Sequence, residues 1–350
     1  MRRHRTKKIR IGSVCIGKDY PIAVQSMCNT KTQNIKSTLK QINELEETGC
    51  DIVRLAVPNL ATIHALKKIR KETDIPLVAD IHFDYKIAIA VMPFVDKIRI
   101  DPGNIGARQN LKRVITSAKD QGIPIRIGIN SGSLEKSLLR KYGGPKPIAL
   151  VESALKDIKF CEKNNFENIV VSIKSTSLLD TIRANEAISK KTEYPLHLGI
   201  TQAGPVWNGT IRSSIGLGCL LERGIGDTIR VSLTGSPIEE VKVGFEILKA
   251  LELRQQGVTI ISCPSCGRTE IDLAKLVSKI QKATKKIKKP IKIAVMGCVV
   301  NGPGEAREAD IGLAGGHKCG AIFRKGKIIK RVSESKIVPE LLKQINKLED

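Results

Sequence analysis

Residues 111–130, which read LKRVITSAKDQGIPIRIGIN, contain one complete unit of the pattern that decides the fold. Residues 111–121 carry apolar side chains at the spacing of an amphipathic helix. The turn Gly122-Ile123-Pro124 follows, and the β-branched run 125–129 is typical of a short strand. Polar Asn130 stands directly after that strand. The stretch therefore predicts a helix, a turn and a strand whose carboxyl end is polar.

The same unit repeats along most of the chain. Further strands are predicted at 22–25, 52–55, 77–79, 97–100, 169–173, 196–200 and 228–233, with amphipathic stretches between them. Eight β-then-α units over about 250 residues are typical of a (β/α)8 barrel. A doubly wound open sheet is the competing interpretation, but no Gly-x-Gly-x-x-Gly follows the first strand. We therefore predict the α/β class, as a (β/α)8 TIM barrel preceded by a hairpin over residues 9–16.

Polar and charged side chains stand at the carboxyl ends of these strands, where TIM barrels carry their chemistry. They are Arg54, Asp80, His82, Arg99, Asp101, Arg126, Asn130, Lys174, Gln202, Arg230 and Ser232, with the pair Gln25-Ser26 after the first strand. Four arginines and a lysine around one opening would repel each other without an anion between them. A guanidinium group fits phosphate oxygens in pairs. Any one arginine there could form a simple salt bridge, but the set predicts a site for a phosphate ester or diphosphate.

The net charge of +24 and the aromatic content of only 3% bear on the partners of the chain. A basic protein makes nucleic acid the first candidate, but so few aromatic residues leave little from which to build stacking platforms. The charge is therefore either composition alone or a field that attracts anionic substrates or an acidic protein. No apolar run approaches the roughly 18 residues of a membrane span, and no apolar segment follows the basic amino terminus. We expect a cytoplasmic protein that binds neither nucleic acid nor membrane.

The pattern changes after residue 256, where we predict a domain boundary. The barrel domain would span residues 1–256, and a smaller α+β domain would span 257–350. For the smaller domain the sequence predicts a strand at 258–261, a helix at 270–287, a strand at 291–296, a hairpin around Lys325-Gly326 and a final helix.

Nine cysteines, scattered singly except for Cys263-x-x-Cys266, do not suit a disulfide framework. A close pair of thiols at a strand end is typical of a metal centre, and Cys298 after a second strand would supply a third ligand. The fourth candidate is Cys319 or a carboxylate, of which Glu305 is the nearest. Four cysteines would form a structural zinc site. Three cysteines and a weaker ligand describe an iron–sulfur cluster with one iron partly open to substrate. Spacing alone leaves both open.

Several strings resemble one known family. They are residues 21–27, 78–84, 102–106, 124–128 and 197–201 and, most specific of all, GCVVNGPGE at 297–305. Together they resemble the 4-hydroxy-3-methylbut-2-en-1-yl diphosphate synthases, the IspG (GcpE) family of the non-mevalonate isoprenoid pathway, in its compact bacterial two-domain form. The resemblance implies a TIM barrel followed by a small iron–sulfur domain.

The same resemblance implies an activity and its cofactor. The expected reaction is the reductive ring opening and dehydration of 2-C-methyl-D-erythritol 2,4-cyclodiphosphate to (E)-4-hydroxy-3-methylbut-2-enyl diphosphate. One [4Fe–4S] cluster per chain would be held by residues matching Cys263, Cys266, Cys298 and Glu305. A flavodoxin or ferredoxin would supply the electrons, and the family forms a head-to-tail homodimer. The residues that match the diphosphate site are Arg54, Arg99, Arg126, Asn130, Lys174, Arg230 and Ser232, with Asp80 close by.

This chain departs from the family pattern at Gln202, where the family has a glutamate beside the substrate. Glutamine forms hydrogen bonds but transfers no proton at neutral pH. We therefore expect His82, Asp80 or an iron-bound water to supply the proton, or the activity to be impaired. The catalytic candidates are Glu305, Asp80, Gln202 and His82.

Two other functions compete with this one. The first is a phosphate-binding barrel with a structural zinc site, and the second is a basic nucleic-acid-binding protein with a zinc-ribbon-like tail. The eight-unit pattern and the motif at 297–305 argue against the second alternative, and the family motifs argue against both.

Overall fold

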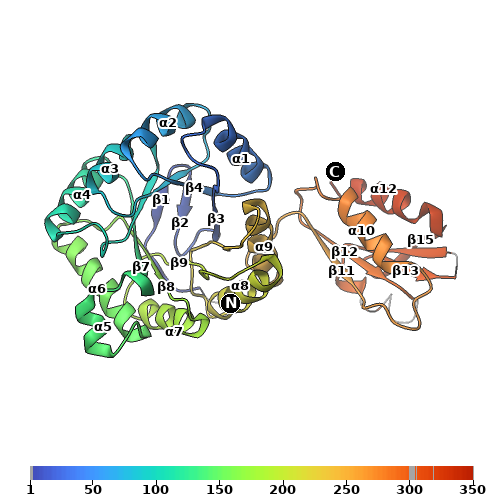
Figure 1. Ribbon diagram of the computed structural model, residues 1–350. Coiled ribbons are helices and arrows are strands. Elements are labelled where there is room, and N and C mark those ends of the chain that lie inside the picture. Colours follow the sequence, from blue (N-terminus) through green and yellow to red (C-terminus); the bar gives the residue numbers. More distant parts are fainter. Residues whose placement is uncertain (1–2, 299–303, 305, 318, 350) are drawn as a thin grey trace. The chain divides into compact units, whose positions relative to one another are not determined.

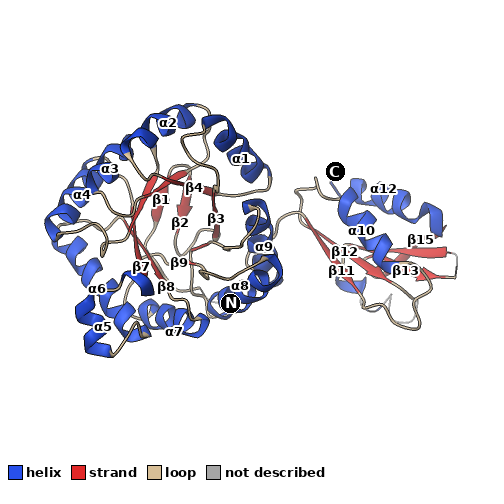
Figure 2. Ribbon diagram, in the orientation of Figure 1, coloured by secondary structure: helices blue, strands red, loops and turns tan. Residues whose placement is uncertain are grey.

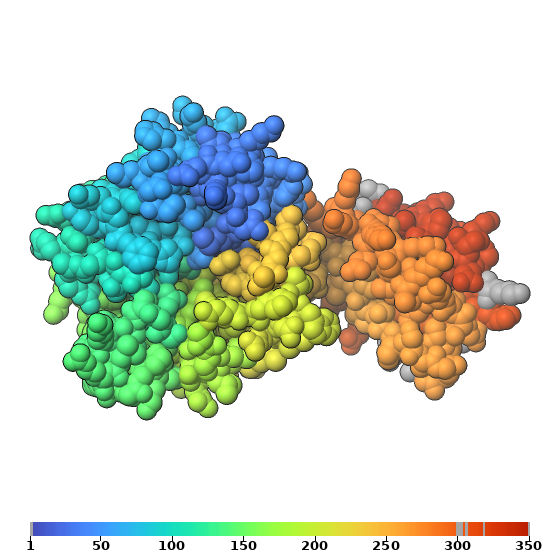
Figure 3. Space-filling model, viewed as in Figure 1, coloured from blue at the N-terminus to red at the C-terminus, as the bar shows by residue number. Residues whose placement is uncertain are grey.

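The computed structural model describes residues 3–298, 304, 306–317 and 319–349. The chain divides into two compact units, Met1–Arg254 and Gln255–Asp350. Each unit is described by itself below. Figure 1 follows the path of the chain through them, and Figure 3 shows one face of the molecule in space-filling form with the same colours along the sequence.

The first unit contains eight parallel strands that form a barrel. They are β3 (Ala23–Met27), β4 (Ile52–Ala56), β5 (Leu77–Asp80), β6 (Lys97–Ile100), β7 (Ile125–Asn130), β8 (Ile169–Lys174), β9 (His197–Leu198) and β10 (Thr228–Ile229). Their order in the sheet is β8-β7-β6-β5-β4-β3-β10-β9, and a parallel bridge between Val171 and Leu196 joins the two ends. The predicted TIM barrel is therefore confirmed.

Helices surround this barrel on all sides (Figure 2). They are α1 (Ile35–Glu47), α2 (Leu60–Lys71), α3 (Tyr85–Val91), α4 (Arg108–Asp120), α5 (Lys136–Tyr142), α6 (Pro147–Lys163), α7 (Leu178–Ser189), α8 (Val206–Glu222) and α9 (Pro237–Ala250), with short 3₁₀ turns η1 (Met92–Phe94) and η2 (Ser131–Ser133). Each long helix buries one stripe, as α1 does with Thr38, Ile42 and Leu45. At the start of α1, the Asn34 side chain accepts a hydrogen bond from the Ser37 amide.

An apolar layer closes the amino-terminal end of the barrel. The hairpin of β1 (Ile9–Ile11) and β2 (Val14–Ile16) buries Ile11 and Ile16 completely. These side chains pack on the first inward-facing residues of four strands, which are Ala23, Ile52, Val78 and Val170. Polar side chains occupy the barrel interior beyond this layer, toward the carboxyl ends of the strands.

The second unit is a five-stranded mixed sheet covered by two helices. Its elements are β11 (Val258–Ser262), α10 (Leu273–Ala283), β12 (Ile291–Met296), η3 (Ala306–Glu308), β13 (Ile311–Gly316), β14 (Cys319–Arg324), β15 (Lys327–Ser333), η4 (Glu334–Lys336) and α12 (Ile337–Glu349). The strands follow one another in order, β11 to β13 parallel and β13 to β15 antiparallel. The unit has its own core, in which Ile293, Leu313 and Ile322 meet Ile280 and Leu341.

Two details of the second unit differ from the sequence prediction. Strand β13 was not predicted, because its sequence IGLAGG contains three glycines, and glycine weakens the strand signal. Helix α10 is shorter at both ends than the predicted 270–287. Its start is fixed by Asp272, whose side chain accepts a hydrogen bond from the Lys275 amide. In the part of the chain that the structure describes, no helix is long and apolar enough to cross a membrane.

Because the hairpin closes the amino-terminal end of the barrel, we predict that the stability of the first unit depends on Ile11. Replacing Ile11 by Ala leaves a cavity under the barrel and is expected to lower the free energy of unfolding by about 2–5 kcal/mol. Denaturant unfolding followed by circular dichroism would measure the loss. The matched control is Ser13→Ala in the exposed turn of the same hairpin, which should change stability little. Equal stability of Ile11→Ala and Ser13→Ala would contradict this account of the closure.

Candidate functional site

The strand ends bring four buried and one half-buried cationic side chain around the carboxyl end of the barrel. Because alternate residues of a strand face the same side, each of these strands directs a charged residue inward near its end. These residues are Arg54 on β4, Arg99 on β6, Arg126 on β7, Lys174 on β8 and Arg230 just after β10. Arg54, Arg99, Arg126 and Lys174 are each at most 7% exposed. The sequence-based prediction of converging cations thus corresponds to one charged opening, which we call the barrel mouth.

The cations at the mouth repel one another. Burial and the neighbouring charges of Arg126, Arg54, Arg230 and Arg99 hold the pKa of Lys174 well below its ordinary value. Burial is also the main cause that lowers the pKa of Arg54 to about 10. A cation is stable in such a place only with an anionic partner.

Asp80 supplies part of the negative charge. Its carboxylate lies 3.2 Å from Arg99 Nη1 and 3.2 Å from His82 Nε2. Burial by itself would raise the pKa of Asp80, but Arg54, the hydrogen bond with His82, and Arg99 outweigh burial and hold that pKa well below its ordinary value. Asp80 is therefore a carboxylate at neutral pH and has no proton to give.

Glu240 on α9 is a second carboxylate at the mouth, and sequence reasoning missed it. It is 4% exposed. Glu240 accepts a hydrogen bond from Ser26 Oγ at 3.0 Å and one from the Leu233 amide at 3.0 Å, and both of its oxygens lie 3.4 Å from Arg230 Nη2. The sequence signal that would have found it is its place in the buried stripe of α9, beside Val241 and Gly244.

Several guanidinium N–H groups at the mouth are buried and have no acceptor among the residues that the structure describes. These are Nε of Arg99 and Arg230 and both Nε and Nη1 of Arg126. Arg54 directs Nε and Nη2 at Met27 Sδ, at 3.0 and 2.9 Å, although a thioether is only a weak acceptor. Buried donors without partners are costly. Oxygen atoms of a multiply charged anion would satisfy these donors.

Two glycines leave the room that the cations occupy. A Cβ at Gly128 would lie 2.9 Å from Arg99 Nε, and a Cβ at Gly199 would lie 3.1 Å from Lys174 Nζ and 2.7 Å from the Arg230 carbonyl oxygen. Any side chain at these positions would displace the charged groups. The arrangement of charged groups at the mouth therefore requires glycine at both positions.

The other predicted residues of the mouth have different surroundings. Asn130 donates to Asp101 Oδ2 at 3.0 Å, and Ser133 Oγ donates to the same oxygen at 2.5 Å. Arg99 Nη2 lies 3.9 Å from Asp101, so the charge of Asp101 is partly balanced. Ser232 is half-buried in the segment after β10.

Gln202 and His82 are the exposed members of the predicted catalytic set. Gln202 lies in the turn after β9 with a left-handed φ of 54°. The His82 side chain is 47% exposed, and Arg99 Nη1 approaches both of its ring nitrogens, at 3.1 and 3.3 Å.

In the second unit, hydrogen bonds connect the segments that carry the three predicted cysteine ligands. The Gly297 amide donates to Cys263 Sγ at 3.2 Å, and the Glu270 amide donates to the Gly297 carbonyl at 3.1 Å. The loop that begins at Cys263 is thereby held against the residue that precedes Cys298. A Cβ at Gly297 would lie 2.8 Å from Thr269 Cγ2, so this close approach requires glycine.

The thiols of this loop have the chemistry of soft-metal ligands. The pKa of Cys266 is lowered, first by the hydrogen bond from the Arg268 amide and then by the Thr269 side chain and the Arg268 charge. Such bonds favour the thiolate, which is the form that binds metal. Glu305 lies outside the described residues. Within the described ranges, no three His, Cys, Asp or Glu side chains are already gathered around one metal position. The donor set nevertheless fits an iron–sulfur centre.

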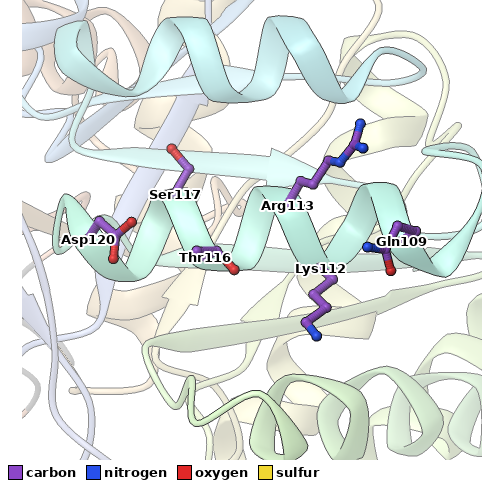
Figure 4. A pocket seen from close by; sticks show the side chains of 6 residues that line it. All are labelled: Gln109, Lys112, Arg113, Thr116, Ser117 and Asp120. Carbon is purple, nitrogen blue, oxygen red and sulfur yellow. The ribbon is translucent and has the colours of Figure 1, made fainter.

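A shallow hollow on the barrel surface is not part of this site. It lies along the outer face of α4, as Figure 4 shows. Its lining residues are Gln109, Lys112, Arg113, Thr116, Ser117 and Asp120. All belong to one helix and none stands at a strand end, so we assign it no function.

Comparison with known proteins covers both units. Residues 6–245 match the GcpE TIM-barrel domain, and residues 259–347 match the GcpE protein C-terminal domain. A protein of Caldanaerobacter subterraneus subsp. tengcongensis named 4-hydroxy-3-methylbut-2-en-1-yl diphosphate synthase (flavodoxin) is 57% identical, over 98% of this chain and 97% of its own length. A protein of the same name from Clostridium perfringens is 55% identical, over 99% of each chain.

Among solved structures, the dihydropteroate synthase of Stenotrophomonas maltophilia superposes with a TM-score of 0.54. It covers 71% of this chain and 97% of its own, at 13% identity. That likeness shows a shared fold for the barrel and nothing more.

The close approach of Arg99 to Gly128 predicts that anion binding at the mouth depends on Gly128. Replacing Gly128 by Ala should displace the Arg99 guanidinium and weaken binding of inorganic diphosphate roughly 10- to 100-fold, because a charge-assisted hydrogen bond is lost. Titration calorimetry would measure the affinity. Gly132→Ala, where an added Cβ meets nothing within 4 Å, is the matched control. Unchanged affinity in Gly128→Ala would show that Arg99 does not contact the anion.

Proposed function

The chain belongs to the GcpE family, and on that premise we propose that it is an iron–sulfur 4-hydroxy-3-methylbut-2-en-1-yl diphosphate synthase. The reaction is the two-electron reductive ring opening and dehydration of 2-C-methyl-D-erythritol 2,4-cyclodiphosphate to (E)-4-hydroxy-3-methylbut-2-enyl diphosphate, in the non-mevalonate isoprenoid pathway. The observation that carries this proposal is the match to relatives of that name along 98–99% of the chain at 55–57% identity. The domain over 1–256 would bind the substrate, and the domain over 257–350 would hold the cluster.

The barrel mouth supports this proposal because its chemistry suits a diphosphate. Arg54, Arg99, Arg126, Lys174 and Arg230 would bind the phosphate oxygens. Among the described residues, the unpaired N–H groups of Arg99, Arg126 and Arg230 are donors available for them. Asn130 and Ser232 would add neutral hydrogen bonds. Glu240 and Asp80 would hold Arg230 and Arg99 in place.

The charges around Asp80 bear on the source of the proton. Asp80 stays ionised, since the pKa of its carboxyl is held low, and the Gln202 amide transfers no proton at neutral pH. Of the three side chains proposed to be catalytic in the barrel, the imidazole of His82 is the remaining general acid–base group. We therefore assign His82 the role of proton carrier, oriented by its bonds to Asp80 and Arg99.

The second unit would hold one [4Fe–4S] cluster through Cys263, Cys266, Cys298 and Glu305. When bound, the cluster supplies electrons one at a time and a Lewis-acidic iron for the departing oxygen. The protein's own part is to direct the amide of Gly297 at Cys263 Sγ and to lower the pKa of Cys266 through the amide of Arg268. Glu305, a weaker ligand than a thiolate, would leave one iron accessible.

Two partners complete the proposal. The names of the relatives include flavodoxin, and an acidic flavodoxin or ferredoxin would be attracted by a chain of net charge +24. A head-to-tail homodimer in the cytoplasm would bring the cluster domain of one chain to the barrel of another.

One experiment tests the activity and the cofactor together. The full chain, purified without oxygen, is expected to be brown, to contain about four irons per chain, and to convert the cyclic diphosphate when reduced flavodoxin is supplied. Iron, sulfide and zinc analysis, the visible spectrum and phosphorus NMR of the product would measure this. A colourless, zinc-loaded protein that takes up no iron and turns over no substrate would leave the zinc-containing phosphate-binding barrel as the better function.

The contact between Gly297 and Thr269 predicts how the cluster site tolerates substitution. Gly297→Ala should push the Cys263–Cys266 loop away and weaken iron retention 10- to 100-fold, as changes next to metal ligands commonly do. Iron remaining after dialysis against a chelator would measure it. Gly267→Ala, where a Cβ meets nothing within 4 Å, is the control inside the same loop. Equal iron loss in both variants would mean that the loop tolerates no side chain anywhere, and the contact would not be the cause.

A further inference from the structure

A second set of polar side chains lies inside the barrel, one layer deeper than the mouth. Lys97 stands two residues before Arg99 on β6, so it faces the same side about 7 Å further from the strand end. Interiors of such barrels are dominated by branched apolar residues. Here Lys97, Gln25, His197 and Thr228 are all at most 1% exposed. These four residues form the inner polar layer.

The groups around Lys97 in this layer do little to stabilise a positive charge on its amine. Its Nζ lies 3.4 Å from Gln25 Oε1, which is a neutral acceptor. Among the described residues it forms no ion pair with a carboxylate, and the buried carboxylate of Asp80 in the mouth is already paired with Arg99 and His82. A buried ammonium without an anionic partner is strongly disfavoured.

The charges that face Lys97 from the surrounding strands are positive. After burial, which is the largest cause, Arg126 on β7 and Arg54 on β4 lower the pKa of Lys97 well below its ordinary value. His197 on β9 is likewise held neutral by burial and by Arg126, Lys174 and Lys97, and its Nδ1 lies 2.7 Å from Thr228 Oγ1. While the mouth is empty, the balance of charge therefore favours a neutral Lys97 amine.

Gln25 is able to support either form of that amine. Its amide oxygen accepts from Lys97, while its buried Nε2 has no hydrogen-bond partner in the described part of the chain. Rotation of the amide by half a turn would direct an N–H group at the lone pair of a neutral amine instead, since the two amide orientations have almost the same shape. One residue thus offers an acceptor to the ammonium and a donor to the amine.

We propose that Lys97 is a proton-accepting positioning residue of the diphosphate site, neutral while the mouth is empty and protonated when the anion binds. The proposal rests on the proposed function of the mouth. A multiply charged anion brings negative potential to the arginines directly above Lys97, and this reverses the balance of charge around its amine. The proton comes from solvent, and Gln25 then turns its oxygen to the ammonium.

Linkage gives the consequence for pH. If binding takes up a proton, the affinity for the anion falls as the pH rises through the range between the amine's pKa in the free protein and in the complex. In that range the affinity for the anion falls by nearly tenfold per pH unit when binding takes up one proton. Below the free-protein pKa the amine is already charged, and this dependence disappears.

The experiment is calorimetric titration of the full chain with inorganic diphosphate at one mildly alkaline pH, in buffers of different ionisation enthalpy. The slope of the observed heat against buffer enthalpy counts the protons taken up. Lys97→Met should take up fewer protons than the wild-type chain, by as much as about one per site. Lys112→Met, which removes an exposed lysine on the outer face of α4 (Figure 4), is the matched control and should match the wild type. Protonation of the diphosphate itself is common to all three and cancels in the difference.

Each outcome decides the proposal. Reduced uptake in Lys97→Met alone supports it, whereas equal uptake in all three proteins overturns it. Absence of any diphosphate binding by the wild type would instead overturn the function proposed for the mouth, and Lys97 would lose its role with it. If Lys97→Met does not fold, Lys97→Gln serves in its place. The affinities of the wild type and of Lys97→Met measured across the alkaline range give an independent test, since the same pH dependence in both proteins contradicts proton uptake by Lys97.

Discussion

Repulsion between buried like charges is the constraint on which the rest of the barrel depends. Arg54, Arg99, Arg126 and Lys174 are almost fully removed from water, where charge interactions are much stronger than at the surface. Asp80 and Glu240 balance only part of that charge. The mouth is consequently a place where protein groups alone leave positive charge and N–H donors unsatisfied. The polyanion that we propose as the ligand would satisfy both.

The burial of apolar side chains elsewhere in the barrel compensates for the free-energy cost of burying this charge. At the amino-terminal end, Ile11 and Ile16 form a dry layer with the first residues of the strands, and a continuous apolar belt fills the space between strands and helices. Burial there offsets the cost of desolvating the cations at the other end. Stability and binding are thus assigned to opposite ends of the same strands, which is the usual division in TIM barrels.

The sequence predicted the barrel and most of its mouth because both depend on local patterns. The strand spacing and the polar residue at each strand end were enough to predict that Arg54, Arg99 and Arg126 lie close together. Glu240 was missed because it reaches the mouth from a helix, and Lys97 because it precedes the strand end by one layer. The cysteine motifs were recognisable, but the contact of Gly297 with Thr269 that brings their loops together depends on tertiary structure.

The deep burial of the arginines also determines which solutes compete for the mouth. Monovalent salt screens charges across water over about 8 Å at physiological strength, but it has little access to groups as enclosed as Arg126, which is 1% exposed. Sodium chloride should therefore weaken ligand binding only slightly. Sulfate and inorganic phosphate resemble the proposed diphosphate ligand and would occupy the same donors. The choice of buffer anion would thus set how much of the protein is free to accept that ligand.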